Sequence, residues 1–156
     1  MSKGYFTFAQ YSKKFDDYPR MAYALALSLK ASQTKGPSDL TVGMTEEDLE
    51  KLPKHYLDVF DVKIIPWTDE AIMHNWKLQN EWKVYHMTPY DETIKLDADM
   101  LFTTDVNYYW EIMKARNFPI GVCNKIHTFR DTVGDDTYYR RGFSENQFYN
   151  AYSALT

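Results

Sequence analysis

The chain has 156 residues, a net charge of −4 and one cysteine, Cys123, so it is long enough for one domain with a core and cannot form an intrachain disulfide. The basic residues form no continuous patch, which gives no support to a nucleic-acid partner, and no apolar run approaches the length of a membrane span. We therefore expect a soluble cytoplasmic protein without a membrane span, and we expect most of its many aromatic residues to lie in the core.

Short apolar strands alternate with helical segments along the chain. Pro19 stands where a first helix begins, a position that tolerates proline, and Thr45 with Asp48 predicts a capping box at the start of a further short helix. We expect strands at 5–10, 39–44, 62–66, 93–97 and 119–123, and helices at 20–30, 71–87 and 106–116. This alternation predicts an α/β fold with a mostly parallel central sheet flanked by helices.

The chain ends at residues 150–156, which have the pattern of the beginning of a strand. We therefore expect residues 1–156 to form a single domain that is incomplete at its C-terminus. A short edge strand at a natural end is the alternative.

Residues 94–102 carry the most informative pattern, an apolar strand that leads into Asp97-Ala98-Asp99. In extended backbone, residues two apart point to the same side, so the carboxylates of Asp97 and Asp99 can converge on one Mg²⁺ or Mn²⁺ ion. Ligands of open α/β sheets bind beyond the carboxyl ends of the strands. We therefore predict a nucleotide site between this triplet and the residues that follow the first strand, with a solvated turn as the alternative.

The segment 81–102 resembles the signature region of glycosyltransferases of the GT-A fold. The resemblance rests on a helix that ends near Tyr90-Asp91, an apolar strand, and the triplet Asp97-Ala98-Asp99 with an apolar pair after it. It is closest to the glycogenin-like and bacterial galactosyltransferase-like enzymes of glycosyltransferase family 8. It implies a Rossmann-like nucleotide-sugar-binding domain that binds a nucleoside-diphosphate sugar, with UDP as the expected nucleotide, together with Mn²⁺ or Mg²⁺.

The resemblance also implies roles for the residues that match the family motif. Asp99 would bind the metal, and Asp97 would bind both the metal and the ribose, with the small Ala98 between them. Ala9 and Gln10 would face the base through their backbone groups.

Three further residues have a role by the resemblance and a simpler alternative. Tyr11 or Tyr18 would stack on the uracil, with ordinary loop packing as the alternative for each. Lys83 would contact the donor, but it lies about two positions out of the family register, and a solvated helix face is the alternative.

The chain also departs from the family pattern. The family's third metal ligand is a histidine followed by glycine and lysine, and the only histidine after Asp99, His127, lacks that context. No general base or nucleophile is identified, and the acceptor stays open. For His86 we expect a structural role, and for Trp76 and Trp82 a place in the core or an interface.

Three alternative functions follow from the same pattern. A non-catalytic or truncated nucleotide-sugar-binding module fits the missing histidine motif. A sugar nucleotidyltransferase needs a glycine-rich loop after the first strand, and residues 8–13 contain no glycine. An Asp-x-Asp phosphatase would carry its motif on the first strand, whereas Asp97 lies in the middle of the chain.

Overall fold

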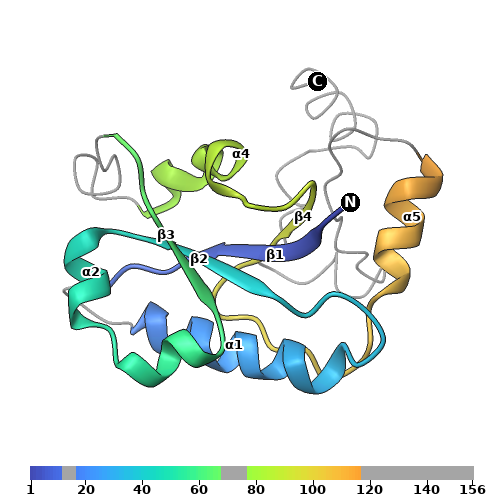
Figure 1. Ribbon diagram of the computed structural model, residues 1–156, viewed down its shortest axis with the longest axis horizontal. Helices are drawn as coiled ribbons and strands as arrows, with labels where there is room; N and C mark the ends of the chain where they lie inside the picture. Colours follow the sequence, from blue (N-terminus) through green and yellow to red (C-terminus); the bar gives the residue numbers. More distant parts are fainter. Residues whose placement is uncertain (12–16, 68–76, 117–156) are drawn as a thin grey trace, which may run out of the picture. The chain divides into compact units, whose positions relative to one another are not determined.

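The computed structural model describes residues 1–11, 17–67 and 77–116, and a parallel sheet forms the centre of its N-terminal part (Figure 1). The chain divides into two compact units, Met1–Tyr108 and Tyr109–Thr156, and the sheet belongs to the first. Its four strands lie in the order β3-β2-β1-β4, and every pair is parallel. The strands are β1 (Lys3–Phe8), β2 (Leu40–Met44), β3 (Asp61–Ile64) and β4 (Glu92–Lys95).

Helices cover both faces of this sheet (Figure 1). On one face lies α1 (Tyr18–Ser32), which buries Pro19, Ala22, Leu25, Ala26 and Leu29. On the other face lie the 3₁₀ helix η2 (Lys77–Lys83) and the short helix α4 (Val84–Met87). The sequence-based prediction of an α/β fold with a parallel sheet flanked by helices is therefore confirmed, whereas the GT-A assignment stays a prediction.

Side-chain caps fix the starts of two helices at the positions that the sequence indicates. The Asp17 carboxylate accepts a hydrogen bond from the Arg20 N–H at 3.0 Å, and Pro19 occupies the first turn of α1. Thr45 Oγ1 accepts one from the Asp48 N–H at 3.1 Å, which caps α2 (Glu46–Lys51). Each of these bonds satisfies a backbone N–H that has no partner within the helix.

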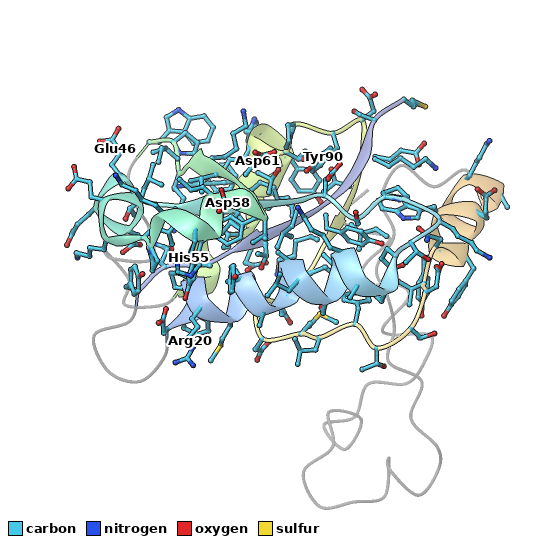
Figure 2. All side chains as sticks on the ribbon, turned by 60° about the horizontal axis from the view of Figure 1, so that its bottom comes forward. Arg20, Glu46, His55, Asp58, Asp61 and Tyr90 are labelled. Atoms are coloured by element: carbon cyan, nitrogen blue, oxygen red, sulfur yellow. The ribbon has the colours of Figure 1, made fainter. Side chains whose placement is uncertain are left out.

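An aromatic cluster joins α1 to η1 (Lys54–Asp58), the 3₁₀ helix that follows α2. The rings of Tyr23 and Tyr56 stack with centroids 4.3 Å apart, and His55 meets the Tyr23 ring edge-on at 5.5 Å. His55 and Arg20 mark this region in Figure 2. The connection from β2 to β3 is thereby held against the α1 face of the sheet.

The opposite face of the sheet has its own apolar cluster. Phe6, Ile65 and Met87 are buried together, and Phe8 and Val84 pack against them. Gly43 in β2 makes this packing possible, since a Cβ atom there would lie 2.8 Å from the Phe8 ring. Because Phe6 and Phe8 point to this side, Tyr5 and Thr7 point toward α1.

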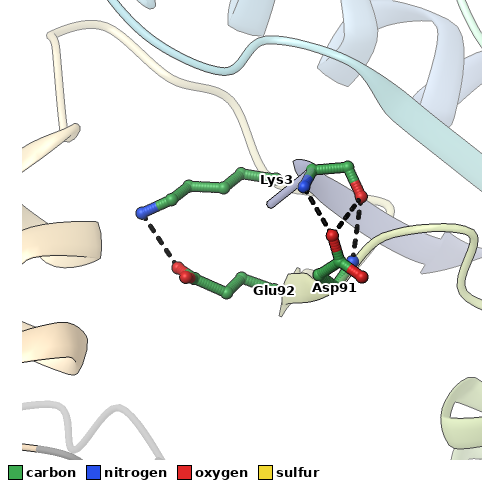
Figure 3. Close-up of polar contacts among 4 residues, drawn as sticks. Lys3, Asp91 and Glu92 are labelled. Carbon is green, nitrogen blue, oxygen red and sulfur yellow. Dashed lines mark hydrogen bonds and ion pairs between the residues drawn. The ribbon is translucent and has the colours of Figure 1, made fainter.

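Polar contacts fix the register of β1 and β4 at their amino ends (Figure 3). Lys3 and Glu92 are register partners, and their side chains form an ion pair at 2.9 Å. The Asp91 carboxylate accepts hydrogen bonds from the Ser2 N–H at 2.7 Å and from the Ser2 hydroxyl at 3.1 Å. These contacts hold the two strands in one alignment.

Some predicted boundaries differ from the structure. Tyr18, expected in a loop, is the first residue of α1. Of the helix predicted at 71–87, residues 71–76 lie outside the described part, residues 77–83 form a 3₁₀ helix, and only α4 is an α-helix. The last described helix is α5 (Tyr108–Arg116), two residues shorter than predicted. The strand predicted at 119–123, with Cys123, and the segment 150–156 lie outside the described residues, as does His127. The single, incomplete domain stays a prediction.

Candidate functional site

The strand order reverses between β1 and β4. The chain places β2 and then β3 on one side of β1, and it returns to place β4 on the other side. The connection after β1 runs through α1 on one face, whereas the connection before β4 runs through η2 and α4 on the other (Figure 1). In open α/β sheets, ligands bind at such a switch point, beyond the carboxyl ends of the strands.

The residues that the sequence analysis selected lie on both sides of this switch point. Ala9 and Gln10 directly follow β1, and residues 97–99 follow β4 after Leu96. The Leu96 N–H donates to the Phe6 carbonyl at 2.8 Å, which extends the pairing of the two strands up to the triplet. The structure thus brings the two predicted parts of the nucleotide site to one edge of the sheet.

The acidic triplet lies in a turn and not in a strand. The Met100 N–H donates to the Asp97 carbonyl at 3.3 Å, and β4 ends at Lys95. The strand predicted at 93–97 therefore ends two residues earlier, and a turn, in place of extended backbone, positions Asp99, because aspartate favours turns over strand interiors. The side chains still alternate, since Ala98 is buried whereas both carboxylates are exposed.

A lysine is the direct partner of the first carboxylate. Lys95 Nζ lies 2.9 Å from Asp97 Oδ1, and the same ammonium group forms an ion pair with Glu81 of η2. Partial burial acts to lower the pKa of Lys95, but the hydrogen bonds to Glu81 and Asp97 outweigh it, and the pKa is raised. Lys95 therefore stays charged and connects η2 to the triplet.

Asp97 and Asp99 are the two carboxylates that the sequence analysis assigned to a divalent cation. Within the described residues there is no group of three or more His, Cys, Asp or Glu side chains that could hold a metal ion. Mg²⁺ in phosphate-binding enzymes is commonly held by one or two carboxylates, with phosphate oxygens and water as the other ligands. A site of that kind needs no more than two protein carboxylates, and a cation held by Asp97 and Asp99 stays a prediction.

On the β1 side of the site, Ala9 and Gln10 are both buried. The Ala9 N–H donates to the Gly43 carbonyl at 3.0 Å, so this group is used by the sheet. Gln10 Oε1 accepts a hydrogen bond from Asn80 Nδ2 at 3.2 Å, which joins the end of β1 to η2. A base contact through the Ala9 backbone would therefore use its carbonyl oxygen.

The two tyrosines proposed for base stacking differ in their surroundings. Tyr11 is partly buried and forms an isolated β-bridge with Asp17. Burial is the main cause that raises the pKa of Tyr11, followed by the charges of Asp17 and nearby groups. Tyr18 is fixed in the first turn of α1, whereas Tyr11 lies one residue after Gln10 and is the better placed of the two.

Lys83 is buried, so the alternative of a solvated helix face is wrong. Its Nζ donates to the Pro66 carbonyl at 3.2 Å and lies 5.8 Å from the centre of the Trp82 ring. Pro66 follows β3, and the strand order puts β2 and β1 between β3 and β4. The structure therefore does not bring the Lys83 ammonium group together with Asp97 and Asp99.

An exposed aromatic cluster of Trp67, Trp82 and His86 lies near the end of β3. Trp82 is 46% exposed, and its ring stacks on Trp67 with centroids 5.7 Å apart. His86 meets the Trp67 ring edge-on at 5.2 Å, and Trp67 has a φ of 62°. The surface position of Trp82 contradicts a place in the core and leaves the expected interface untested, while Trp76 lies outside the described residues.

Comparison with known proteins gives no identification of this site. No model of a known protein family matches the chain, and no curated protein matches it at a significant level. In the part of the chain that the structure describes, no helix is long and apolar enough to cross a membrane.

Proposed function

We propose that this chain is the nucleotide-sugar-binding part of a metal-dependent glycosyltransferase, with a UDP sugar as donor and a hydroxyl group as acceptor. The observation that carries the proposal is that Asp97 and Asp99 follow β4 next to the end of β1, where the strand order reverses. The resemblance of residues 81–102 to glycosyltransferase family 8 supplies the reaction class.

Different residues of the chain bind the two ends of the donor. Asp97 and Asp99 hold the diphosphate end of the donor through the cation, and the backbone after β1 together with Tyr11 holds the base. A divalent cation bound there supplies charge neutralisation and Lewis acidity for departure of the nucleoside diphosphate. The acceptor hydroxyl attacks the anomeric carbon of the sugar, the bond from that carbon to the diphosphate oxygen breaks, and the hydroxyl proton passes to solvent as the new glycosidic bond forms.

Titration calorimetry with UDP tests this proposal. We expect MnCl₂ to strengthen UDP binding by about tenfold or more, which corresponds to about 1.4 kcal/mol. The Asp99→Asn variant should lose this enhancement, because an amide supplies a weaker ligand than a carboxylate. Asp61→Asn is the matched control, since Asp61 is also exposed but lies at the start of β3, at the amino end of the parallel sheet. The proposal would be contradicted if Mn²⁺ did not change the affinity for UDP. It would also be contradicted if both variants lost the enhancement by Mn²⁺ to the same extent.

A non-catalytic binding module is the second candidate. It is favoured by the sequence, in which His127, the only histidine after Asp99, is not followed by the glycine and lysine of the family motif. Hydrolysis of a UDP sugar distinguishes the two: release of UDP above the Asp99→Asn background supports the enzyme, and tight binding without release supports the module.

A further inference from the structure

Lys95 carries a positive charge into the region where the proposed cation would bind. It is the last residue of β4 and lies two positions before Asp97. Its ammonium group contacts Asp97 on one side and Glu81 on the other. The Asp97 side chain is 69% exposed, whereas those of Lys95 and Glu81 are only 28% and 31% exposed.

The ammonium group would compete with a divalent cation for the same oxygen atom of Asp97. Lys95 Nζ lies at hydrogen-bond distance from Asp97 Oδ1, at 2.9 Å, and a metal ion on that oxygen would be repelled by the lysine charge. Glu81 offers the lysine a second carboxylate that the cation does not need. The Lys95 ammonium group can therefore move away from Asp97 and keep its ion pair with Glu81.

We propose that Lys95 is a positioning residue that acts as a built-in counter-cation, neutralising Asp97 when no divalent cation is bound and pairing with Glu81 alone when one is. This inference rests on the proposed function, because it takes Asp97 as a metal ligand. It follows that Lys95 weakens cation binding, that Glu81 strengthens it, and that the two side chains together set the cation concentration at which the donor binds.

We expect two substitutions to change the affinity for Mn²⁺ in opposite directions. Lys95→Met keeps the length of the side chain and removes the charge, and we expect it to tighten Mn²⁺ binding about tenfold in saturating UDP, as measured from the free Mn²⁺ signal in electron paramagnetic resonance. Glu81→Gln leaves the lysine only Asp97 as a partner, and we expect Mn²⁺ binding about threefold weaker. Circular dichroism checks that each variant is folded, and Glu81→Gln tests the inference even if Lys95→Met does not fold.

The other end of the same strand provides matched controls. Lys3 and Glu92 form an ion pair of 2.9 Å with side chains 24% and 25% exposed, and they lie at the amino ends of β1 and β4 (Figure 3). Lys3→Met and Glu92→Gln change the net charge as the test variants do, and we expect them to leave Mn²⁺ affinity unchanged.

The outcomes separate the inference from the proposed function. If the unsubstituted protein binds no Mn²⁺ with UDP, the proposed function fails. If it binds Mn²⁺ and Asp99→Asn abolishes the binding, but Lys95→Met leaves the affinity unchanged or weakens it, only the role of Lys95 is overturned. A change of the same size in Lys3→Met would also overturn it, because the effect would then be one of net charge.

Discussion

The hydroxyl of Thr7 is buried in the centre of the sheet, and replacing Thr7 with valine should stabilise the protein. Thr7 is 1% exposed, and its Oγ1 has no hydrogen-bond partner within the described residues. A buried polar group without a partner costs about 1–3 kcal/mol. Valine has nearly the same shape, lacks the hydroxyl and suits a strand interior. We expect Thr7→Val to raise the free energy of unfolding by about 1 kcal/mol, which is about 2–4 °C in melting temperature for a chain of this size.

Thr41→Val is the matched control for this substitution. Thr41 is a fully buried threonine in the adjacent strand β2, but its Oγ1 donates to the Tyr90 hydroxyl at 3.0 Å. Removing this hydroxyl breaks that bond, so we expect the free energy of unfolding to fall by about 1 kcal/mol. Urea denaturation followed by circular dichroism measures both values. If Thr7→Val destabilises the protein, or if both variants shift in the same direction, then hydrogen bonding does not decide the stability at these two positions.

Two further predictions concern the amino end of the sheet. A Cβ atom on Gly4 would overlap the Tyr90 ring, so we expect Gly4→Ala to lower the free energy of unfolding by about 1–3 kcal/mol, and a smaller loss in a Tyr90→Ala background, measured as a double-mutant cycle in urea. The hydrogen bonds from the Ser2 N–H and hydroxyl lower the pKa of Asp91 below its ordinary value of 3.8, so its stabilising effect is complete above that pH and is lost as the pH falls through the lower folded-state value. In the Asp91→Asn variant, the melting temperature should therefore fall less steeply as the pH is lowered below about 4. An equally steep fall in both proteins would show that these bonds do not stabilise the fold.

Local patterns in the sequence were sufficient to predict the layers of the fold. Pro19 and the cap at Thr45 both occur where the structure starts a helix. The first turn of a helix leaves backbone N–H groups without partners; Pro19 has no such group, and the Thr45 side chain binds one. The alternation of strands with helices predicts parallel pairing, since a crossover returns the chain to the same end of the sheet. The same pattern does not predict the order of the strands. It therefore does not predict on which side of β1 the strand β4 lies.

The region around η2 shows what a pattern of apolar residues leaves undetermined. The helix expected at 71–87 leaves Lys83 on a solvated face, but residues 77–83 form a 3₁₀ helix, with a different number of residues per turn. Lys83 is buried there, and Trp82 is exposed. Neither the pairing of Lys95 with Glu81 nor the stacking of Trp67 on Trp82 could be predicted, because both join residues whose proximity depends on the path of η2. The contact of Lys95 with Asp97 could have been found, since residues two apart at the end of a strand share a face.

The register of β1 and β4 connects the amino end of the sheet to the candidate site. A slip of one residue would turn every side chain of β4 to the opposite face. Lys95 and Asp97 would then point away from η2 and Glu81, and Leu96 would replace them. The Lys3–Glu92 ion pair and the Ser2–Asp91 hydrogen bonds oppose such a slip, because each requires the observed alignment. The polar contacts at one end of these short strands thus determine which side chains reach the other end, where the order of the sheet reverses and a ligand can bind.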